Sequence, residues 1–261
     1  MQYKLEIQGL TKRFVEKTLF EDLNLTVTGP AILWAPSGWG KTTLLRILMG
    51  LEVPTSGTVS GVGRVGAVFQ EDRLCPQLNA VQNVELVLPE GKEQYKEQIE
   101  TDFLQFGLDR AALALPARKL SGGQKRRVAI AGVLAMDPKV LILDEPTAGL
   151  DPRGRDTILG EIREYHEERK NTVLLVSHRK STMAVADRCT VLRKGKCIGT
   201  VETANTTAEE LSAMMVGRNV SFHVEKGPLK PGGEVLSVEH LTVASKVHKN
   251  NAVKNVSFQV R

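Results

Sequence analysis

The stretch that decides the fold reads Ala35-Pro36-Ser37-Gly38-Trp39-Gly40-Lys41-Thr42-Thr43. A short apolar run at 31–34 precedes it, and a helical pattern at 41–49 follows and ends at Gly50. A strand, a glycine-rich loop and a helix in this order leave backbone N–H groups around a concavity at the helix N-terminus, where anions bind. The stretch therefore predicts a phosphate-binding loop in an α/β fold.

Each residue of this loop has an expected role. A Cβ at Gly38 or Gly40 would keep the backbone away from the phosphates, so glycine is expected there. Lys41 is expected to reach the β- and γ-phosphates, and the Thr42 hydroxyl to ligate Mg²⁺. Two residues depart from the common pattern: Ala35 stands where a glycine is usual and must keep a negative φ, and Trp39 is bulky and is expected to point out of the loop. The residues predicted to hold the nucleotide are Ser37, Gly38, Trp39, Gly40, Lys41, Thr42 and Thr43.

A second motif is the run Val140-Leu141-Ile142-Leu143-Asp144-Glu145, an apolar strand that ends on two carboxylates. In a parallel sheet the carboxyl ends of the strands form the edge where ligands bind. Asp144 is expected to hold Mg²⁺ there, and Glu145 to orient or deprotonate a water that attacks the γ-phosphorus. An isolated Asp-Glu pair fits a solvated turn better, but the loop upstream favours ATP hydrolysis.

Composition narrows the class of protein. The chain has 261 residues, of which 41% are hydrophobic and 25% charged, as in an ordinary globular protein of one large or two small domains. The net charge of +5 is mild and fits a solvated surface better than a nucleic-acid partner. The polar N-terminus does not read as a secretory signal, the apolar runs are too short to cross a bilayer, and the three cysteines lack metal-ligand spacing. We expect a cytoplasmic protein with reduced thiols.

Strand and helix patterns alternate along the chain. Strands are predicted at 23–27, 31–34, 65–69, 140–143 and 172–176, and helices at 41–49, 122–136 and 152–170. A polar helical insertion occupies 79–113, with Gly91 and Gly107 as breaks. This alternation predicts a mostly parallel sheet with helices on its faces.

The start of the chain is echoed near its end. Leu5, Ile7, Leu10 and Thr11 recur at the same spacing as Leu236, Val238, Leu241 and Thr242, and the block 23–27 recurs as 256–260. The Pro/Gly-containing stretch 226–233 reads as a linker before this restart. The alternative is that two pairs of amphipathic strands simply look alike.

The motif Leu120-Ser121-Gly122-Gly123-Gln124 makes the resemblance specific. Over residues 1–220 the chain resembles the ATPase subunits of ATP-binding cassette (ABC) transporters, and this motif matches their signature without departure. The resemblance implies a P-loop NTPase fold with a mixed, mostly parallel core sheet, an antiparallel β subdomain and a small helical subdomain at about 79–136. It also implies that Ser121, Gly122, Gly123 and Gln124 contact ATP held by a second chain.

Four further residues take expected roles from the same resemblance. Gln70 matches the glutamine that contacts Mg²⁺ and faces the permease, and Asp151 matches an aspartate of the dimer interface near the nucleotide. His178 matches the switch histidine that hydrogen-bonds the γ-phosphate, and Phe14 the aromatic ring that stacks on adenine. The alternatives are a structural histidine, a surface glutamine and a core phenylalanine.

The resemblance changes along the chain. Residues 1–180 are similar to the compact ATPases of nitrate, sulfonate and taurine importers, whereas residues 183–261 are similar to tandem ATPases of simple-sugar and nucleoside importers. We therefore expect an ABC ATPase domain at 1–220, a linker at 221–233 and a truncated start of a second ABC domain at 234–261. A single ordinary lineage is the alternative.

These features favour the energy-coupling subunit of a membrane importer. Its expected cofactors are ATP and Mg²⁺, and its partners are transmembrane permease subunits and a second ABC ATPase, identical or different, with a solute-binding protein involved only indirectly. The permease would hold it on the inner face of the cell membrane. A non-transport ABC ATPase acting on ribosomes or DNA fits less well, because such relatives carry Asn-His where this chain has Ala148-Gly149. A degenerate ATP-binding remnant is disfavoured by the intact Lys41, Asp144, Glu145 and His178.

Overall fold

The computed structural model describes residues 4–36, 38–88, 96–218, 233, 235–244 and 251–260. The chain divides into two compact units, Met1–Val220 and Ser221–Arg261. Three sequence predictions concern residues outside the described ones: Ser37, the break at Gly91 and, apart from Gly233, the linker at 221–233.

The first unit is built on a six-stranded sheet with the order β5-β6-β7-β3-β8-β9. All neighbours are parallel except β8 and β9, as the predicted mixed, mostly parallel sheet requires. The strands are β3 (Pro30–Trp34), β5 (Val65–Val68), β6 (Val140–Asp144), β7 (Thr172–Val176), β8 (Arg188–Arg193) and β9 (Lys196–Glu202). Sequence analysis did not predict β8 and β9. Their signal was the turn Lys194-Gly195, both residues with positive φ, which joins two strands into a tight hairpin.

Alternate side chains of the central strands enter two separate cores. Ile32, Leu143 and Leu175 pack with apolar residues of α5 (Gly122–Ala135) and α6 (Pro152–Arg169). Leu33 and Leu174 pack on the other face, with α1 (Lys41–Leu48). Every residue of β3, β6 and β7 is buried, which explains why these strands read as continuous apolar runs.

An antiparallel sheet of three strands completes the second core. Its order is β2-β1-β4. Its strands are β1 (Lys4–Phe14), β2 (Lys17–Thr28) and β4 (Ser56–Ser60). Leu5, Ile7 and Leu10 of β1 are at most 2% exposed, because they pack with α1 and the central sheet.

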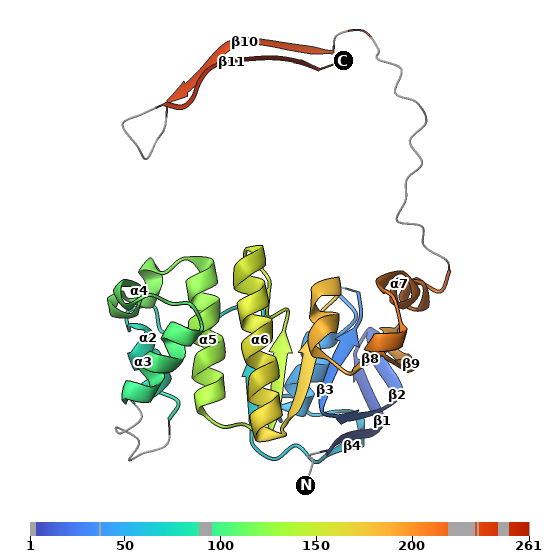
Figure 1. Ribbon diagram of the computed structural model, residues 1–261. Helices are drawn as coiled ribbons and strands as arrows, with labels where there is room; N and C mark the ends of the chain where they lie inside the picture. The colour runs from blue at the N-terminus through green and yellow to red at the C-terminus, as the bar shows by residue number, and fades with distance from the viewer. Residues whose placement is uncertain are drawn as a thin grey trace. The chain divides into compact units, whose positions relative to one another are not determined.

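The remaining helices of the first unit are short. In Figure 1 α2, α3 and α4 gather beside α5, and α6 lies next to α5 along the central sheet. The short helices are α2 (Ala80–Glu85), α3 (Lys96–Gln105), η2 (Ala117–Lys119), α4 (Arg110–Ala114), η3 (Lys180–Val185), η4 (Thr203–Asn205) and α7 (Ala208–Val216). Within the described part of the chain, no helix is both long enough and apolar enough to cross a membrane.

The second unit contains an antiparallel hairpin, β10 (Leu236–Ala244) and β11 (Asn251–Val260). Its register copies that of β1 and β2: Val238 pairs with Phe258 as Ile7 pairs with Leu25, and both ladders shift register directly after this pair. The copy includes the irregular residues. His240 and Asn255 have positive φ at the places of Gly9 and Asp22.

The side-chain hydrogen bonds to the backbone of these irregular residues also match between the two hairpins. The Gly9 N–H donates to Asn24 Oδ1 at 2.8 Å, and the His240 N–H donates to Ser257 Oγ at 2.9 Å. The N–H groups of Asp22 and Asn255 each donate at 3.1 Å to a threonine, Thr11 and Thr242 respectively. The two hairpins thus share a register shift, two residues with positive φ and two side-chain hydrogen bonds at corresponding positions.

Candidate nucleotide-binding site

Four neighbouring strands end at one edge of the central sheet. The register places Asp144 beside Val176, Val176 beside Leu33, and Val68 beside Leu143. The segments that follow these strands therefore start side by side, although they are far apart in the sequence. They carry the glutamine (70), the Asp-Glu pair (144–145), the histidine (178) and the phosphate loop (35–43) that the sequence singled out.

The phosphate loop has the backbone that its glycines predict. Gly38 and Gly40 have φ of +79° and +85°, and Ala35 is not among the residues with positive φ. A Cβ on Gly38 would meet nothing within 4 Å, whereas one on Gly40 would lie 2.9 Å from Phe20 Cζ. Glycine at 40 is therefore required by its left-handed conformation and by β2, in addition to any approach to phosphate.

Lys41 begins α1 and turns back over the loop. Its Nζ donates to the Ala35 carbonyl oxygen at 2.9 Å. This contact holds the ammonium beside the backbone at the start of the loop. Trp39 and Thr43 are half-buried, and Thr42 is exposed.

Asp144 is the last residue of β6 and is buried. Burial raises the pKa of its carboxyl, and the positive charge of Lys41 opposes this shift. A buried carboxylate close to a lysine and to a phosphate loop suits a bound cation, because a cation would supply the charge compensation that the protein supplies only in part.

Glu145 is held in an unusual backbone conformation, with φ of +47°. Its N–H donates to the Val176 carbonyl at 2.8 Å, which fixes it to the neighbouring strand. Its carboxylate lies 2.7 Å from His178 Nδ1 and accepts a hydrogen bond of 3.4 Å from Ser177 Oγ. The structure thus brings Glu145 and His178 into direct contact, and Glu145 is buried while His178 is exposed.

Two other predicted residues are exposed at or just after the ends of strands. Gln70 is exposed and follows β5 by two residues. Phe14 is 49% exposed at the end of β1, with Lys12 Nζ 5.0 Å from its ring centre, so it is not a core residue. An exposed ring beside a cation is available for stacking.

The signature residues Ser121–Gln124 form the N-terminal cap and the first turn of α5. Ser121 Oγ accepts from the Gln124 N–H at 3.2 Å, and Gln124 Oε1 accepts from the Ser121 N–H at 2.9 Å, which forms a capping box. Ser121 and Gly122 are exposed. A Cβ on Gly123 would meet Leu150 at 3.2 Å, so the signature packs closely on the loop before α6.

Asp151 also caps a helix. Its Oδ1 accepts from the Gly154 N–H at 3.2 Å at the start of α6, and Pro152 occupies the first helical position. Asp151 is exposed, so its carboxylate can cap the helix and still face a neighbouring molecule.

Sequence analysis missed Arg126, which joins several of these segments. Its guanidinium is buried and donates to the backbone carbonyls of Phe69, Asp144, Glu145 and Pro146. The sequence shows only an arginine two residues after the signature, and its burial became visible in the structure.

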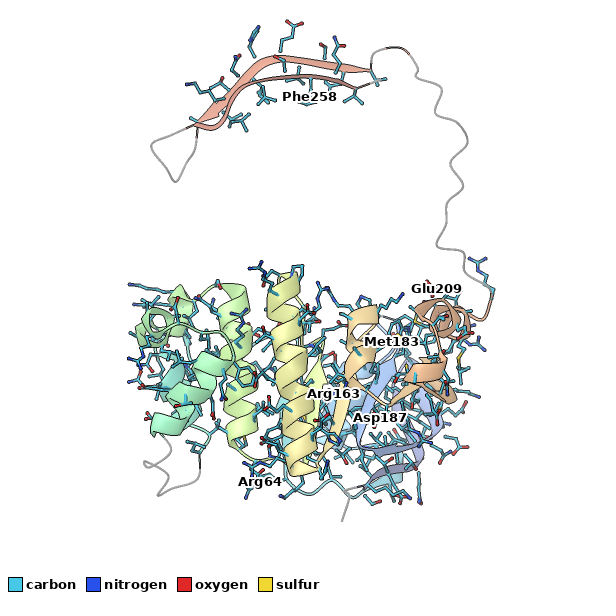
Figure 2. The ribbon with its side chains drawn as sticks, viewed as in Figure 1. Arg64, Arg163, Met183, Asp187, Glu209 and Phe258 are labelled. Atoms are coloured by element: carbon cyan, nitrogen blue, oxygen red, sulfur yellow. The ribbon has the colours of Figure 1, made fainter. Side chains whose placement is uncertain are left out.

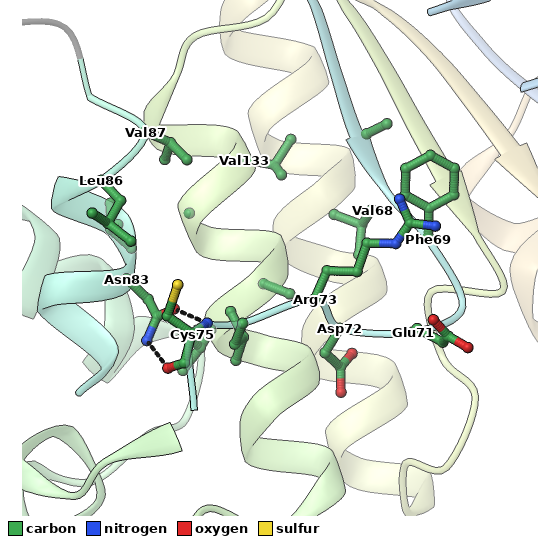
Figure 3. Close-up of a pocket in the computed structure, with 16 residues that line it drawn as sticks. Val68, Phe69, Glu71, Asp72, Arg73, Cys75, Asn83, Leu86, Val87 and Val133 are labelled. Atoms are coloured by element: carbon green, nitrogen blue, oxygen red, sulfur yellow. Dashed lines mark hydrogen bonds between the residues drawn. The ribbon is translucent and has the colours of Figure 1, made fainter. Parts of the chain in front are cut away.

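A groove of about 350 Å³ (Figure 3) is lined in part by Phe69 and Asp72, two residues that this arginine contacts. The segment after β5 forms one wall with Phe69, Asp72 and Arg73, and α2 and α5 form the rest. The groove is mostly apolar, with charged side chains near one end.

Comparison with known proteins agrees with this geometry. The family model described as ABC transporter matches residues 22–148. The energy-coupling factor transporter ATP-binding protein EcfA2 of Clostridium tetani is 40% identical over 222 residues, which cover 74% of this chain and 77% of that protein. The ribose import ATP-binding protein RbsA 1 of Burkholderia thailandensis is 34% identical over 268 residues, which cover 92% of this chain and 52% of that protein.

A solved structure gives the same result. The ATP-binding cassette MJ0796, a dimer in a post-hydrolysis state bound to ADP and Pi, has a TM-score of 0.69 at 27% identity. The match covers 76% of this chain and 98% of MJ0796. The fold, the phosphate loop and these relatives lead to one conclusion: the chain belongs to the ABC transporter family, as an ATP-binding and ATP-hydrolysing subunit.

Proposed function

We propose that this ATPase powers an importer, and that two cassettes close on ATP so that each completes the other's site. One observation carries the proposal. The residues that meet at one edge of the central sheet are Lys41, Asp144, Glu145 and His178. Ser121 and Gly122, in contrast, are exposed at the start of α5. A site built in two halves fits a reaction that requires two chains.

The residues at the edge suit Mg²⁺. Thr42, Asp144 and Gln70 offer a hydroxyl, a carboxylate and an amide oxygen, and Mg²⁺ prefers oxygen ligands together with nucleotide phosphates. Burial raises the pKa of the Asp144 carboxyl, and a bound cation would stabilise its ionised form. When bound, Mg²⁺ neutralises charge on the β- and γ-phosphates.

The remaining steps are assigned to side chains. Lys41 and the loop amides hold the phosphates, and Phe14 stacks on adenine. Glu145 accepts a proton from the attacking water or orients it, and His178, now bound to Glu145, moves to hydrogen-bond the γ-phosphate. The dimer partner contributes Ser121–Gln124 to the phosphate and Asp151 to the interface.

The membrane partner is proposed from the groove and the relatives. The groove beside Phe69 and Asp72 offers an apolar floor with charges at one end, which fits a short helix of a permease. The relatives named above are the ATP-binding protein of an energy-coupling factor transporter and a ribose import ATP-binding protein, which supports a role in import. We place the subunit on the inner face of the membrane, bound to the permease, with any solute-binding protein involved only indirectly. No nucleic-acid partner is proposed.

The second unit is proposed as the beginning of a second cassette, after a linker at 221–233. The hairpin of β10 and β11 supports this proposal, because it has the same register shift, residues with positive φ and side-chain hydrogen bonds as the hairpin of β1 and β2. The chain spans about half the length of RbsA 1, which leaves room in that relative for further sequence.

Light scattering of a Glu145→Gln variant, with and without MgATP, tests the clamp. The variant keeps the binding residues and loses the carboxylate, so MgATP is expected to double its mass. Trp34 directly precedes the loop and Trp39 lies within it, so intrinsic fluorescence is expected to report nucleotide binding in the same sample.

The control variant adds Ser121→Asp to Glu145→Gln. Aspartate caps a helix as well as serine does, so α5 is preserved, but its charge repels the γ-phosphate of the partner's ATP. This double variant should bind ATP and stay monomeric. If it dimerises as readily, or if Glu145→Gln alone binds ATP without dimerising, the two-chain site is wrong.

A further inference from the structure

Arg126 connects the groove to the residue proposed as general base. Its Nη2 donates to the carbonyl oxygens of Asp144 and Glu145 at 2.5 and 2.9 Å, and its Nε donates to Pro146 at 3.1 Å. Three consecutive carbonyls around Glu145 thus depend on one guanidinium.

The same side chain holds the other segment. Nη1 donates to the Phe69 carbonyl and lies 3.4 Å from Asp72 Oδ1. Both residues line the groove, and Arg73 covers the Phe69 ring at 4.0 Å, as Figure 3 shows. The planar Arg126 guanidinium therefore links the segment that forms the groove wall to the backbone around Glu145.

The arginine is buried with a charge that is only partly compensated. Its side chain is 3% exposed, and that of Asp72 is 22% exposed. Burial lowers the pKa of Arg126 and raises that of Asp72, against their mutual attraction. Such an arrangement is costly for stability alone, so a role in geometry gives a better account of it.

We infer that Arg126 is a positioning residue: it sets the backbone of Glu145 for hydrolysis and transmits a change in the groove segment to that backbone. The inference rests on the proposed role of Glu145 and of the groove. The Arg126 guanidinium donates to backbone carbonyls and lies against Asp72, so its effect is expected on the rate of hydrolysis and not on ATP affinity.

Arg126→Lys is the informative variant, because it keeps the charge but loses the planar fork that reaches several carbonyls at once. We expect kcat to fall about 10- to 100-fold, with KM for ATP and the tryptophan-detected affinity within about threefold of the parent. Arg127→Lys is the matched control, because the Arg127 guanidinium donates to the Gly107 carbonyl at 2.9 Å, in a different part of the fold.

An Arg126→Lys variant with kcat within threefold of the parent would overturn the inference. So would a parallel loss of ATP affinity, since that would indicate a general structural role. If the parent and the Arg127→Lys variant hydrolyse no MgATP, the proposed function fails instead.

Alkylation of Cys75 tests the coupling without relying on turnover. Cys75 is exposed in the groove, whereas burial raises the pKa of Cys189 to about 12 and raises that of Cys197, so a maleimide should prefer Cys75. In the Glu145→Gln background, MgATP should change the Cys75 rate at least about threefold, and adding Arg126→Lys should abolish that change. The coupling is refuted if MgATP does not change the Cys75 rate in the Glu145→Gln protein. It is also refuted if MgATP still changes that rate after Arg126→Lys is added.

Discussion

Asp144, which we propose as a cation ligand, carries a cost to the stability of the fold. Its carboxyl is buried, and burial raises its pKa despite the nearby Lys41. A carboxyl whose pKa is higher in the folded protein than in the unfolded chain favours folding when protonated. The ionised form therefore destabilises the fold above the folded-state pKa, and this cost disappears as the pH falls toward the ordinary value for aspartate.

Asp144→Asn should therefore stabilise the nucleotide-free protein at neutral pH and abolish hydrolysis. With Mg²⁺ chelated, we expect its Tm to exceed that of the parent by about 2–4 °C at pH 8, which corresponds to ~1 kcal/mol, and the gap to shrink as the pH falls toward 4. Thermal unfolding of both proteins at several pH values is the measurement. The exposed Asp156 in α6 offers the control, since Asp156→Asn should show no such trend. A variant less stable than the parent at pH 8 would contradict the assignment.

At the scale of elements, burial decides what each hairpin contributes. Leu25 and Phe258 occupy the same place in the two hairpins, yet Leu25 is 5% exposed and Phe258, labelled in Figure 2, is 45% exposed. Leu25→Ala should lower the free energy of unfolding by about 2–4 kcal/mol. Phe258→Ala should change it by less than about 0.5 kcal/mol, because the Phe258 side chain is nearly half exposed on a two-stranded hairpin. Urea unfolding followed by fluorescence of the buried Trp34 measures both; equal losses would show that Phe258 belongs to the folded core.

Elements with strong local signals could be predicted from the sequence. The buried strands β3, β6 and β7 were found because apolar runs of this length fit few other structures, and α1 and α6 because Gly50 and Pro152 mark their ends. β9 was missed because its residues alternate between exposed and half-buried, without the strongly apolar face that a core strand has. Arg126 was missed because its acceptors are carbonyl oxygens, which every residue carries and no sequence pattern marks.

For the whole molecule, the family and the ATPase fold followed from three motifs in a fixed order, and the comparisons confirmed them. The residues of the site are a different matter. Position in a motif predicts a role, but the contact between Glu145 and His178 arises only when β6 and β7 become neighbours, and the roles themselves stay predictions. The likeness between residues 5–27 and 236–260 could be seen in the spacing of their apolar residues. The shared register shift and the shared side-chain hydrogen bonds could be seen only in the structure.

The copied hairpin predicts how the whole molecule associates. In β1 and β2 the apolar face is covered by α1 and the central sheet, whereas the corresponding residues of the second unit, such as Leu236, Leu241 and Val260, are 40–49% exposed. Two-stranded hairpins are marginally stable alone, and their free edges and apolar faces promote association. We therefore expect the 261-residue chain to gain mass with concentration in the absence of nucleotide, and a chain ending at residue 218 to stay monomeric.

Association through the hairpin and dimerisation driven by ATP can be distinguished by adding nucleotide. With Glu145→Gln in both chains, MgATP should dimerise the shorter chain as well, because the loop and the signature both lie in the first unit. Light scattering over a range of concentrations measures this. If the shorter chain binds ATP but fails to dimerise, the hairpin is part of the clamp and not an addition to it. If instead the full chain stays monomeric at every concentration without ATP, the apolar face of the hairpin does not drive association.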